Sequence, residues 1–498
     1  MHTLSKLNKK MKNNIFILCL LLASYGLNAQ FSTPNTGVNW TLDDIVAASP
    51  TTVSFDGVAY TLHQDLMVEE NDSLTLGDDL ILKIAPGVEI GVKGYFKSDS
   101  DDVILITAVD SGNHYKGFWL YDESEIFFRN TVIEFGGGLK VVTANFQMHG
   151  CEVSDNSAGS STGAAISFSK GSPIIKDSFF FYNDKPALSS AANASVSALI
   201  EGNYFEGNHQ LNGNAPQINM GPSGTADSIR IINNVIIGDR DMTRVGGISA
   251  SSLVGVENKI LIRGNTIIDN RYGITSMGGM SSGIIADNII EDNDTEGDPM
   301  LGGSGINLLA TDLVFVTNNQ IRRNLWGITL QNEALINLGS DDQEDFNPGL
   351  NVFSENGNGG VVYALYNNTP NEVKALHNCW IEGQESTLAD VEEVIFHKPD
   401  DSSLGEVFYD PFECGEEMSV SDVNTDNFRI YPNPAIDFLM ILSQKTGDLR
   451  IIDMSGRTVL NKENIGSDSM VRFNLPKGVY LVEFVNENGK QNQKLIVK

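Results

Sequence analysis

One pattern of eleven residues, GNTIIDNRYGI from Gly264 to Ile274, constrains the fold of this chain more than any other feature. An Asn is followed by an apolar residue two positions later and by a second Asn five positions later, and similar stretches recur from residue 130 to residue 378. The first polar position falls at Asn130, Cys151, Asp177, Asn203, Asn234, Asn265, Asn288, Asn319, Asn351 and Asn378. Successive copies are separated by 21 to 32 residues. A fixed local pattern at irregular spacing is typical of a solenoid whose coils stay in register while its loops vary.

The residue types of the repeat favour strands over helices. The units are rich in Ile, Val, Phe, Asn and Gly, and the helix formers never align at the helical period of about 3.6 residues. We therefore predict an all-β chain whose main part is a parallel β-helix. The Asn columns would mark its corners, because Asn tolerates a left-handed backbone and its amide can bond the Asn stacked above. A second polar column comprises Asn156, Asn208, Asp239, Asn270, Asn293, Asn324 and Asn356.

Two flanking stretches give the β-helix a family resemblance. LKIAPGVEIGV, from Leu82 to Val92, resembles the first coils of bacterial right-handed β-helix proteins, with a strand, a Pro-Gly corner and another strand. NCWIEG at Asn378 to Gly383 and GEVFYDPFEC at Gly405 to Cys414 resemble the closing coil of the same proteins. The resemblance implies a right-handed solenoid. We place the N-terminal segment and first coils at residues 30–109 and the repeats at 110–414.

The first 29 residues have the pattern of a signal peptide. Four Lys precede an apolar run from Ile15 to Ala23, and Ala29 offers a cleavage point before Gln30. The apolar run is too short to span a membrane comfortably, and no later stretch is long enough. We therefore expect an exported mature protein without a transmembrane segment.

The last 71 residues carry the most specific resemblance in the chain. A polar, acidic stretch at 415–427 reads as a linker, and residues 428–498 form short alternating strands separated by Asn, Pro and Gly turns, which suggests a small Ig-like β-sandwich. This domain resembles the type A C-terminal sorting domain of the type IX secretion system. The resemblance rests on YPNP, DMSGRTV, LPKGVYLVEF and the terminal KLIVK, and its signal positions are Tyr431, Pro432, Asn433, Pro434, Gly456, Gly478, Lys494 and Lys498. It implies recognition by the type IX machinery and a protein that is secreted or attached to the outer cell surface.

Charge restricts the partners of the central region. Residues 30–427 hold 57 of the 64 acidic residues and 19 of the 33 basic ones, a formal net charge of −38. Such a field opposes nucleic acids and anionic membranes, and it disfavours acidic polysaccharides unless a cation or a local basic patch intervenes.

Three cysteines remain after the predicted signal peptide. Cys379 and Cys414 flank the closing coil and could form a disulfide in an oxidising compartment, or they could be two unpaired thiols. Cys151 occupies a position of the polar column and reads as a buried free thiol.

A column of basic residues is the sharpest candidate for substrate binding. Arg240 and Arg271 both come six residues after their column Asn, so they should lie on adjacent coils, about 4.8 Å apart along the axis. His209 occupies the same register one coil earlier, and Arg322 and Arg323 come nearby two coils later. The column could hold an anionic sugar. The alternative is a solvated corner whose Arg side chains pair with Asp239, Asp241 and Asp269, and this alternative is favoured.

Catalytic and metal motifs are weaker. Asp269, Glu291, Asp292 and Asp294 lie on neighbouring coils, but chance explains their closeness in so acidic a region. The acidic runs at 99–102, 292–298 and 341–345 could bind Ca²⁺ loosely, although the second lacks the Glu that ends an EF-hand loop. We identify no catalytic residue and predict no specific metal ligand.

The sequence thus favours a glycan-binding or adhesive surface protein. The alternatives are a polysaccharide lyase or glycoside hydrolase acting along the β-helix face, and a structural spacer without a ligand.

Overall fold

The computed structural model describes residues 30–157, 163–298 and 301–414, and in the C-terminal part residues 428–431, 435, 438–443, 445–453, 457–466, 469–487 and 489–497. The chain divides into two compact units, one ending at Cys414 and the other beginning at Gly415. The predicted signal peptide and linker lie outside the described residues, as do Pro432, Asn433, Pro434, Gly456 and Lys498 of the sorting signal.

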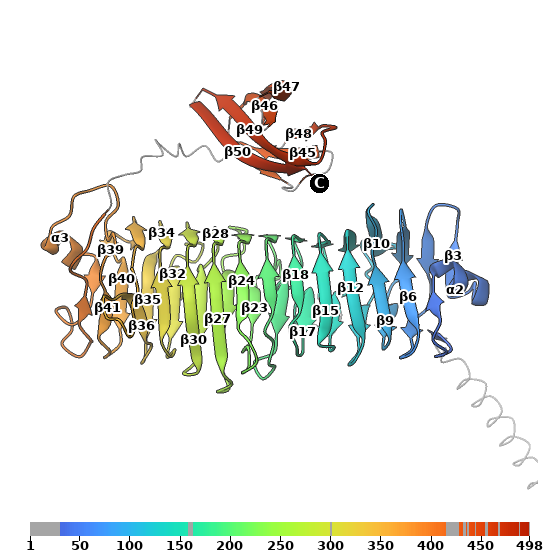
Figure 1. Ribbon diagram of the computed structural model, residues 1–498, viewed down its shortest axis with the longest axis horizontal. Helices are drawn as coiled ribbons and strands as arrows, with labels where there is room; N and C mark the ends of the chain where they lie inside the picture. The colour runs from blue at the N-terminus through green and yellow to red at the C-terminus, as the bar shows by residue number, and fades with distance from the viewer. Residues whose placement is uncertain are drawn as a thin grey trace, which may run out of the picture. The chain divides into compact units, whose positions relative to one another are not determined.

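The first unit is a parallel β-helix, as the repeats predicted. Its strands stack coil upon coil into three long sheets, here named A, B and C (Figure 1). Sheet A contains β1 (Phe31–Ser32), β5 (Leu66–Val68), β8 (Glu89–Val92), β11 (Gly117–Leu120), β14 (Leu139–Val141), β17 (Ile166–Phe168), β20 (Leu188–Ser190), β23 (Pro216–Met220), β26 (Gly246–Ala250), β29 (Ile274–Met277), β32 (Ser304–Leu309), β35 (Trp326–Gln331), β40 (Leu365–Asn368) and β42 (Ile395–Phe396). Sheet B contains β2 (Asn39–Trp40), β6 (Ser73–Leu76), β9 (Tyr95–Ser98), β12 (Glu125–Arg129), β15 (Asn145–His149), β18 (Ile174–Lys176), β21 (Leu199–Glu201), β24 (Ile229–Ile232), β27 (Asn258–Arg263), β30 (Ser281–Ala286), β33 (Val314–Thr317), β36 (Ile336–Gly339), β41 (Val373–Ala375) and β43 (Val407–Phe408). Sheet C contains β3 (Val53–Phe55), β4 (Tyr60–Leu62), β7 (Ile81–Ile84), β10 (Ile104–Ala108), β13 (Thr131–Glu134), β16 (Glu152–Ser154), β19 (Phe179–Phe181), β22 (Tyr204–Glu206), β25 (Val235–Ile237), β28 (Thr266–Ile268), β31 (Ile289–Glu291), β34 (Gln320–Arg322) and β37 (Val352–Ser354).

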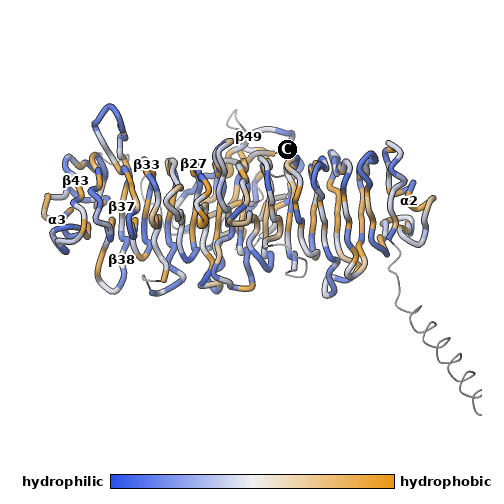
Figure 2. Tube along the Cα trace, turned by 90° about the horizontal axis from the view of Figure 1, so that it is seen from below, coloured by the Kyte–Doolittle hydropathy of each residue, from blue (hydrophilic) through white to orange (hydrophobic). Residues whose placement is uncertain are grey.

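Alternation along each strand builds the core. In sheet C, the central residue of the three-residue strands points inward, and its partners above and below do the same. The resulting column is fully buried and consists of Ile133, Val153, Phe180, Phe205, Ile236, Ile267, Ile290, Ile321 and Phe353. Hydrophobic and hydrophilic positions therefore recur in every coil (Figure 2).

Two ladders of buried amides run along corners of the solenoid. The first includes Asn203, Asn234, Asn265, Asn288, Asn319, Asn351 and Asn378, and each Nδ2 donates to Oδ1 of the next Asn over 2.9 Å. The left-handed backbone expected at this corner belongs to the preceding residue. Gly202, Asn233, Gly264, Asp287 and Asn318 have φ between 53° and 68°.

The predicted polar column is one residue out of register in two coils. Asn130 and Asp177 take the left-handed position themselves, with φ of 48° and 50°. Ser178, not Asp177, takes the ladder position, because its backbone N–H donates to Asn203 Oδ1 over 2.9 Å. An Asn or Asp is acceptable at either of the two corner positions, so the local pattern could not distinguish them.

The second ladder also differs from the predicted column. It runs through Asn156, Asn183, Asn208, Gln217, Asn270, Asn293, Asn324 and Asn356. Gln217 from β23 takes the place predicted for Asp239, because its amide accepts from Asn208 and donates to Asn270, both over 3.0 Å. A carboxylate has no donor for the next amide, which explains why Asp239 is not part of the ladder.

Short elements close the two ends of the solenoid. At one end, α2 (Leu42–Ala48) begins with a capping box between Thr41 and Asp44, and the antiparallel pair β3 and β4 follows it (Figure 1). At the other end, α3 (Leu388–Glu392) precedes β42, and a hairpin of β38 (Gly357–Asn358) and β39 (Val361–Val362) projects from the last coils. Such ends cover strand edges that would otherwise be open to pairing.

The second unit is a small β domain. One sheet contains β44 (Arg429–Tyr431), β45 (Phe438–Leu442) and β48 (Ser469–Arg472), and the other contains β46 (Gly447–Asp453), β47 (Thr458–Ile465), β49 (Gly478–Asn486) and β50 (Gly489–Val497). Buried residues of both sheets, among them Leu439, Ile451 and Phe484, form one hydrophobic core. Tyr431 lies in β44, Gly478 begins β49 and Lys494 lies in β50.

Candidate functional site

A single outward-facing column runs along the middle of sheet A. Its members pair strand by strand, and the side chains on either side of them in each strand point into the core. The column reads Ser32, Met67, Gly91, Trp119, Lys140, Ser167, Ser189, Asn219, Ser249, Thr275, Asn307, Thr329, Tyr366 and Phe396. Seven consecutive positions in its centre, from Ser167 to Thr329, carry a hydroxyl or an amide and no charge.

The centre of this column forms the floor of a groove with a cavity volume of about 510 Å³. One wall comes from the turns between sheets C and A, and it includes Asn214, Ala215, Arg271, Tyr272, Leu301 and Gly302. The opposite wall comes from the turns between sheets A and B, and it includes Ala192, Gly221, Ser251 and Leu253. The groove therefore crosses several coils and lies along the solenoid.

Polar groups on the floor differ in how many of their possible hydrogen bonds are made to other groups of the protein. Ser304 and Thr329 share a hydrogen bond of 2.7 Å between their hydroxyls, and Ser249 and Ser251 share one of 3.0 Å. In contrast, the Asn219 amide and the Thr275 hydroxyl make no side-chain hydrogen bond within the described chain. Asn307 Oδ1 accepts from Gln331 over 3.4 Å, while its Nδ2 donates to no described group. These groups can bond to a ligand in the groove without breaking a bond of the protein.

Aromatic side chains lie on and beside sheet A at both ends of the polar stretch. At one end, Trp119 stacks on Tyr121 with ring centroids 5.2 Å apart, and Lys140 Nζ lies 3.7 Å above the Trp119 ring. At the other end, Trp326, Tyr366 and Phe396 form a continuous stack with centroid spacings of 4.5 Å, and Tyr363 contacts the edge of this stack. These rings are half-buried. Nine strand steps separate β11 from β40, which corresponds to about 43 Å.

Three of the predicted basic residues are paired with carboxylates. Arg240 contacts Asp269 and Asp294 at 2.8 and 2.7 Å. Arg322 contacts Glu291 and Glu382, and Arg323 contacts Glu291 and Asp292, all within 2.8 Å. The hydrogen bonds that Arg323 donates to the Asp292 carboxylate are the main reason that the pKa of its guanidinium is raised.

The other two members of the predicted column differ in their surroundings. His209 is 7% exposed, its Nδ1 lies 3.2 Å from the Ala215 carbonyl, and burial lowers the pKa of its imidazole. Arg271 lines the groove, where its terminal nitrogens donate to Asn214 Oδ1 and to the Leu301 carbonyl. Of the predicted binding residues, Arg271 is therefore the one that the structure places in the groove.

The acidic runs considered for calcium contact basic side chains. Asp99 pairs with Lys97 and Arg129, and Asp342 and Asp345 both pair with Lys374. Across the described residues, no group of three or more His, Cys, Asp and Glu side chains is arranged to hold a metal ion.

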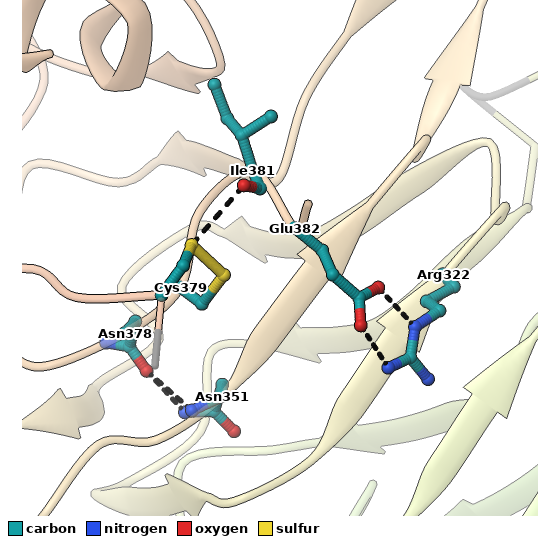
Figure 3. The surroundings of a disulfide bond; sticks show 7 residues. Arg322, Asn351, Asn378, Cys379, Ile381 and Glu382 are labelled. Atoms are coloured by element: carbon teal, nitrogen blue, oxygen red, sulfur yellow. Dashed lines mark hydrogen bonds and ion pairs between the residues drawn. A yellow bond between two sulfur atoms is a disulfide. The ribbon is translucent and has the colours of Figure 1, made fainter. Parts of the chain in front are cut away.

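The closing coil is crosslinked. Cys379 and Cys414 form a disulfide, and Cys151 is a buried free thiol. Asn378, the last member of the first ladder, lies directly before Cys379 (Figure 3). Nearby, Glu382 accepts two hydrogen bonds from the Arg322 guanidinium, and these bonds lower the pKa of its carboxyl. The disulfide, the ladder and this ion pair thus meet at one end of the solenoid.

The C-terminal unit matches a known family. Residues 429–498 match the family model described as "Secretion system C-terminal sorting domain". The second unit is a type IX sorting domain. This sorting domain directs the protein out of the cell, so the protein is secreted or displayed on the cell surface. No curated protein matches the chain. No solved structure matches it either. The helices within the described part of the chain are too short or too polar to cross a bilayer.

Sequence reasoning missed the column on sheet A. Its signal is present, because several strands of this sheet repeat an apolar, polar, apolar triplet. Examples are Ile218-Asn219-Met220, Ile248-Ser249-Ala250 and Ile306-Asn307-Leu308. Aligning the copies on this second strand, in addition to the Asn corner, would have brought the polar positions together.

Proposed function

We propose that this protein binds an extended glycan along the outer face of sheet A, outside the cell. The observation that carries the proposal is the continuous outward column, in which uncharged hydroxyl and amide groups are followed by stacked aromatic rings. Sugars offer both complementary features, namely hydroxyls that exchange hydrogen bonds and apolar ring faces that pack on aromatic side chains.

Periodicity supports a polymer in preference to a small molecule. The floor repeats one polar side chain per coil, at the strand spacing of about 4.8 Å. Asn219, Thr275 and Asn307 occupy three of these steps and have unused hydrogen-bonding groups. A chain of sugars lying parallel to the solenoid axis would meet such groups repeatedly, and the stack at Tyr366 would extend the same track.

The composition of the groove favours binding over hydrolysis. A glycosidase needs two carboxyl groups on either side of the bond that it cleaves. Within the part of the chain that the structure describes, the residues that line the groove include neither Asp nor Glu. The acids on neighbouring coils that could have formed such a pair, Asp269 and Asp294, both contact Arg240 instead.

A panel of neutral and uronate-containing polysaccharides tests the proposal. The purified secreted protein is run through affinity gels that contain each polymer, with and without Ca²⁺, while reducing ends and the absorbance of unsaturated products are followed in parallel. We expect retention by at least one polymer without product. Asn219→Ala combined with Asn307→Ala should weaken this retention, whereas Asn145→Ala, an exposed amide on sheet B, should not. Release of product would show an enzyme instead, and absence of retention by every polymer would refute glycan binding.

A further inference from the structure

Among the described residues, one charged side chain, that of Arg271, lines the groove on sheet A. The remaining lining residues within the described chain are uncharged, and they include Ser190, Asn219, Thr275, Asn307 and Gln331. A single cation in a neutral groove is a specificity element, because it distinguishes ligands by charge at one position.

The charge of Arg271 is not neutralised by the protein. Its two hydrogen-bond acceptors, Asn214 Oδ1 and the Leu301 carbonyl, are uncharged, and it forms no ion pair with the described residues. Arg240 comes from the same position of the preceding coil, yet it contacts two carboxylates. The two arginines therefore share a sequence position and differ in their availability to an anion.

The guanidinium of Arg271 also has unused donors. Arginine carries five N–H groups. One terminal N–H is used by Asn214 and one by Leu301, and Nε is buried beside Gly302 without a hydrogen-bond partner. The two remaining terminal N–H groups have no acceptor among the described residues, so they are available to bond to a ligand. Carboxylates and sulfate esters match such donors in charge and geometry.

We propose that Arg271 makes the groove selective for glycans that carry an isolated anionic substituent, a carboxylate or a sulfate ester, on an otherwise neutral chain. This inference rests on the proposed glycan binding. The anion would bond to the free terminal donors at the wall of the groove, while the neutral sugars on both sides occupy the floor.

The acidity of the whole region explains why the anion should be isolated. Residues 30–427 carry a formal net charge of −38, which repels a polymer with a charge on every sugar. One uncompensated guanidinium can offset one negative group locally, but it cannot offset a dense row of them. We therefore expect a fully anionic polymer to bind more weakly than a sparsely substituted one.

Matched ligands and matched variants test the inference. A sparsely uronate-substituted polysaccharide is compared with its carboxyl-reduced form, and a sparsely sulfated polysaccharide with its desulfated form. The secreted protein is measured as wild type, Arg271→Gln, Arg271→Lys and Arg240→Gln. Arg240→Gln is the control, because this arginine is paired and does not line the groove. Affinity gels or calorimetry give the dissociation constants.

We expect wild type to bind at least one of the two anionic forms about 10-fold or more tightly than its neutral counterpart. Arg271→Gln should remove this preference and keep the affinity for the neutral form. Arg271→Lys should keep part of the preference, and Arg240→Gln should keep all of the preference. Equal binding of every anionic form and its counterpart by wild type would overturn the inference and leave glycan binding intact. A preference for the anionic form that persists in Arg271→Gln would also overturn the inference. So would an equal loss of affinity for the anionic and the neutral form in that variant, because Arg271 would then only position the groove walls. Absence of binding to all forms would refute the proposed function itself.

Discussion

Asn234 donates its side-chain Nδ2–H to Asn265 Oδ1 on the next coil over 2.9 Å and to the Ile200 carbonyl on the previous coil over 3.0 Å. The Asn265 oxygen also accepts the Asn234 backbone N–H over 2.9 Å. The Asn234 amide is thereby bonded to the next ladder amide and to the backbone of the previous coil, although it is almost completely buried. A buried amide is destabilising only if its groups lack hydrogen-bond partners. Here the groups are paired, so the ladder connects adjacent coils by hydrogen bonds.

Replacing one ladder amide tests its contribution. Asn265→Ala leaves the Asn234 N–H and the Ile231 carbonyl without their partners. We expect the free energy of unfolding of the solenoid to fall by about 3 kcal/mol, since each buried unpaired group costs about 1–3 kcal/mol. Urea titration followed by circular dichroism measures the loss. Asn145→Ala, at an exposed position of β15, should change stability by no more than about 0.5 kcal/mol, and equal losses in both variants would contradict the explanation.

The first coil depends on a buried carboxylate. Asp72 is 1% exposed and accepts four backbone N–H bonds from residues 35–38, at 2.7 to 3.0 Å. Burial by itself raises the pKa of Asp72, but the Val38 N–H and the donors of residues 33–36 lower it more, so its pKa lies below the ordinary value of 3.8. The charged form is therefore favoured by folding.

This shift predicts an acid-dependent loss of stability. A lowered folded-state pKa contributes stability that is present above the unfolded pKa and disappears as pH falls through the folded pKa. Asp72→Asn should lower stability at neutral pH by about 2 kcal/mol, because its NH₂ group would face the Asn35 N–H. The difference between wild type and variant should narrow below about pH 4. Thermal unfolding across this range measures it, with exposed Asp102→Asn as the control. A difference that stays constant with pH would refute the role of the charge.

The disulfide should stabilise the closing coil. Cys379 and Cys414 are 35 residues apart, and closing a loop of this length in the unfolded chain corresponds to about 3–4 kcal/mol. We expect Cys379→Ser combined with Cys414→Ser to make the end of the solenoid the first part to be cleaved by a protease. Addition of a reducing agent should have the same effect on wild type and no further effect on the double variant. Unchanged cleavage in both would mean that packing alone holds this end.

Export of the protein to the cell surface should depend on the sorting domain at residues 429–498. Deletion of this segment should leave the chain in the periplasm, since the outer-membrane step requires recognition of the domain. Fractionation and protease accessibility of intact cells measure the location. An unrelated periplasmic reporter fused to residues 415–498 should reach the surface. A deleted chain that still reaches the surface would refute the assignment of export to this domain.

The repeat made the fold predictable, because every coil carries its own copy of the corner and of the inward residue. The site depends on contacts that no single copy contains. Gln217 joins the second ladder from β23 of sheet A. Arg271 donates to Asn214, 57 residues before it, and to the Leu301 carbonyl, 30 residues after it. Arg240 has the same offset from its column Asn and pairs with Asp269 and Asp294 instead. Loops of variable length decide between these outcomes, and their conformations are not encoded in the repeated pattern.

The aromatic stack supplies the last prediction. Tyr366 lies between Trp326 and Phe396, with centroid spacings of 4.5 Å on both sides, and it occupies the same outward column as the groove floor. Loss of a stacking surface typically costs about 0.5–1.5 kcal/mol, so Tyr366→Ala should weaken retention by a bound polysaccharide about 3- to 10-fold. Phe315→Ala, which removes a half-buried ring from the outer face of sheet B, is the matched control and should leave retention unchanged. Equal effects of the two substitutions would indicate a general loss of structure, and no effect of either would confine the glycan to the polar floor of the groove.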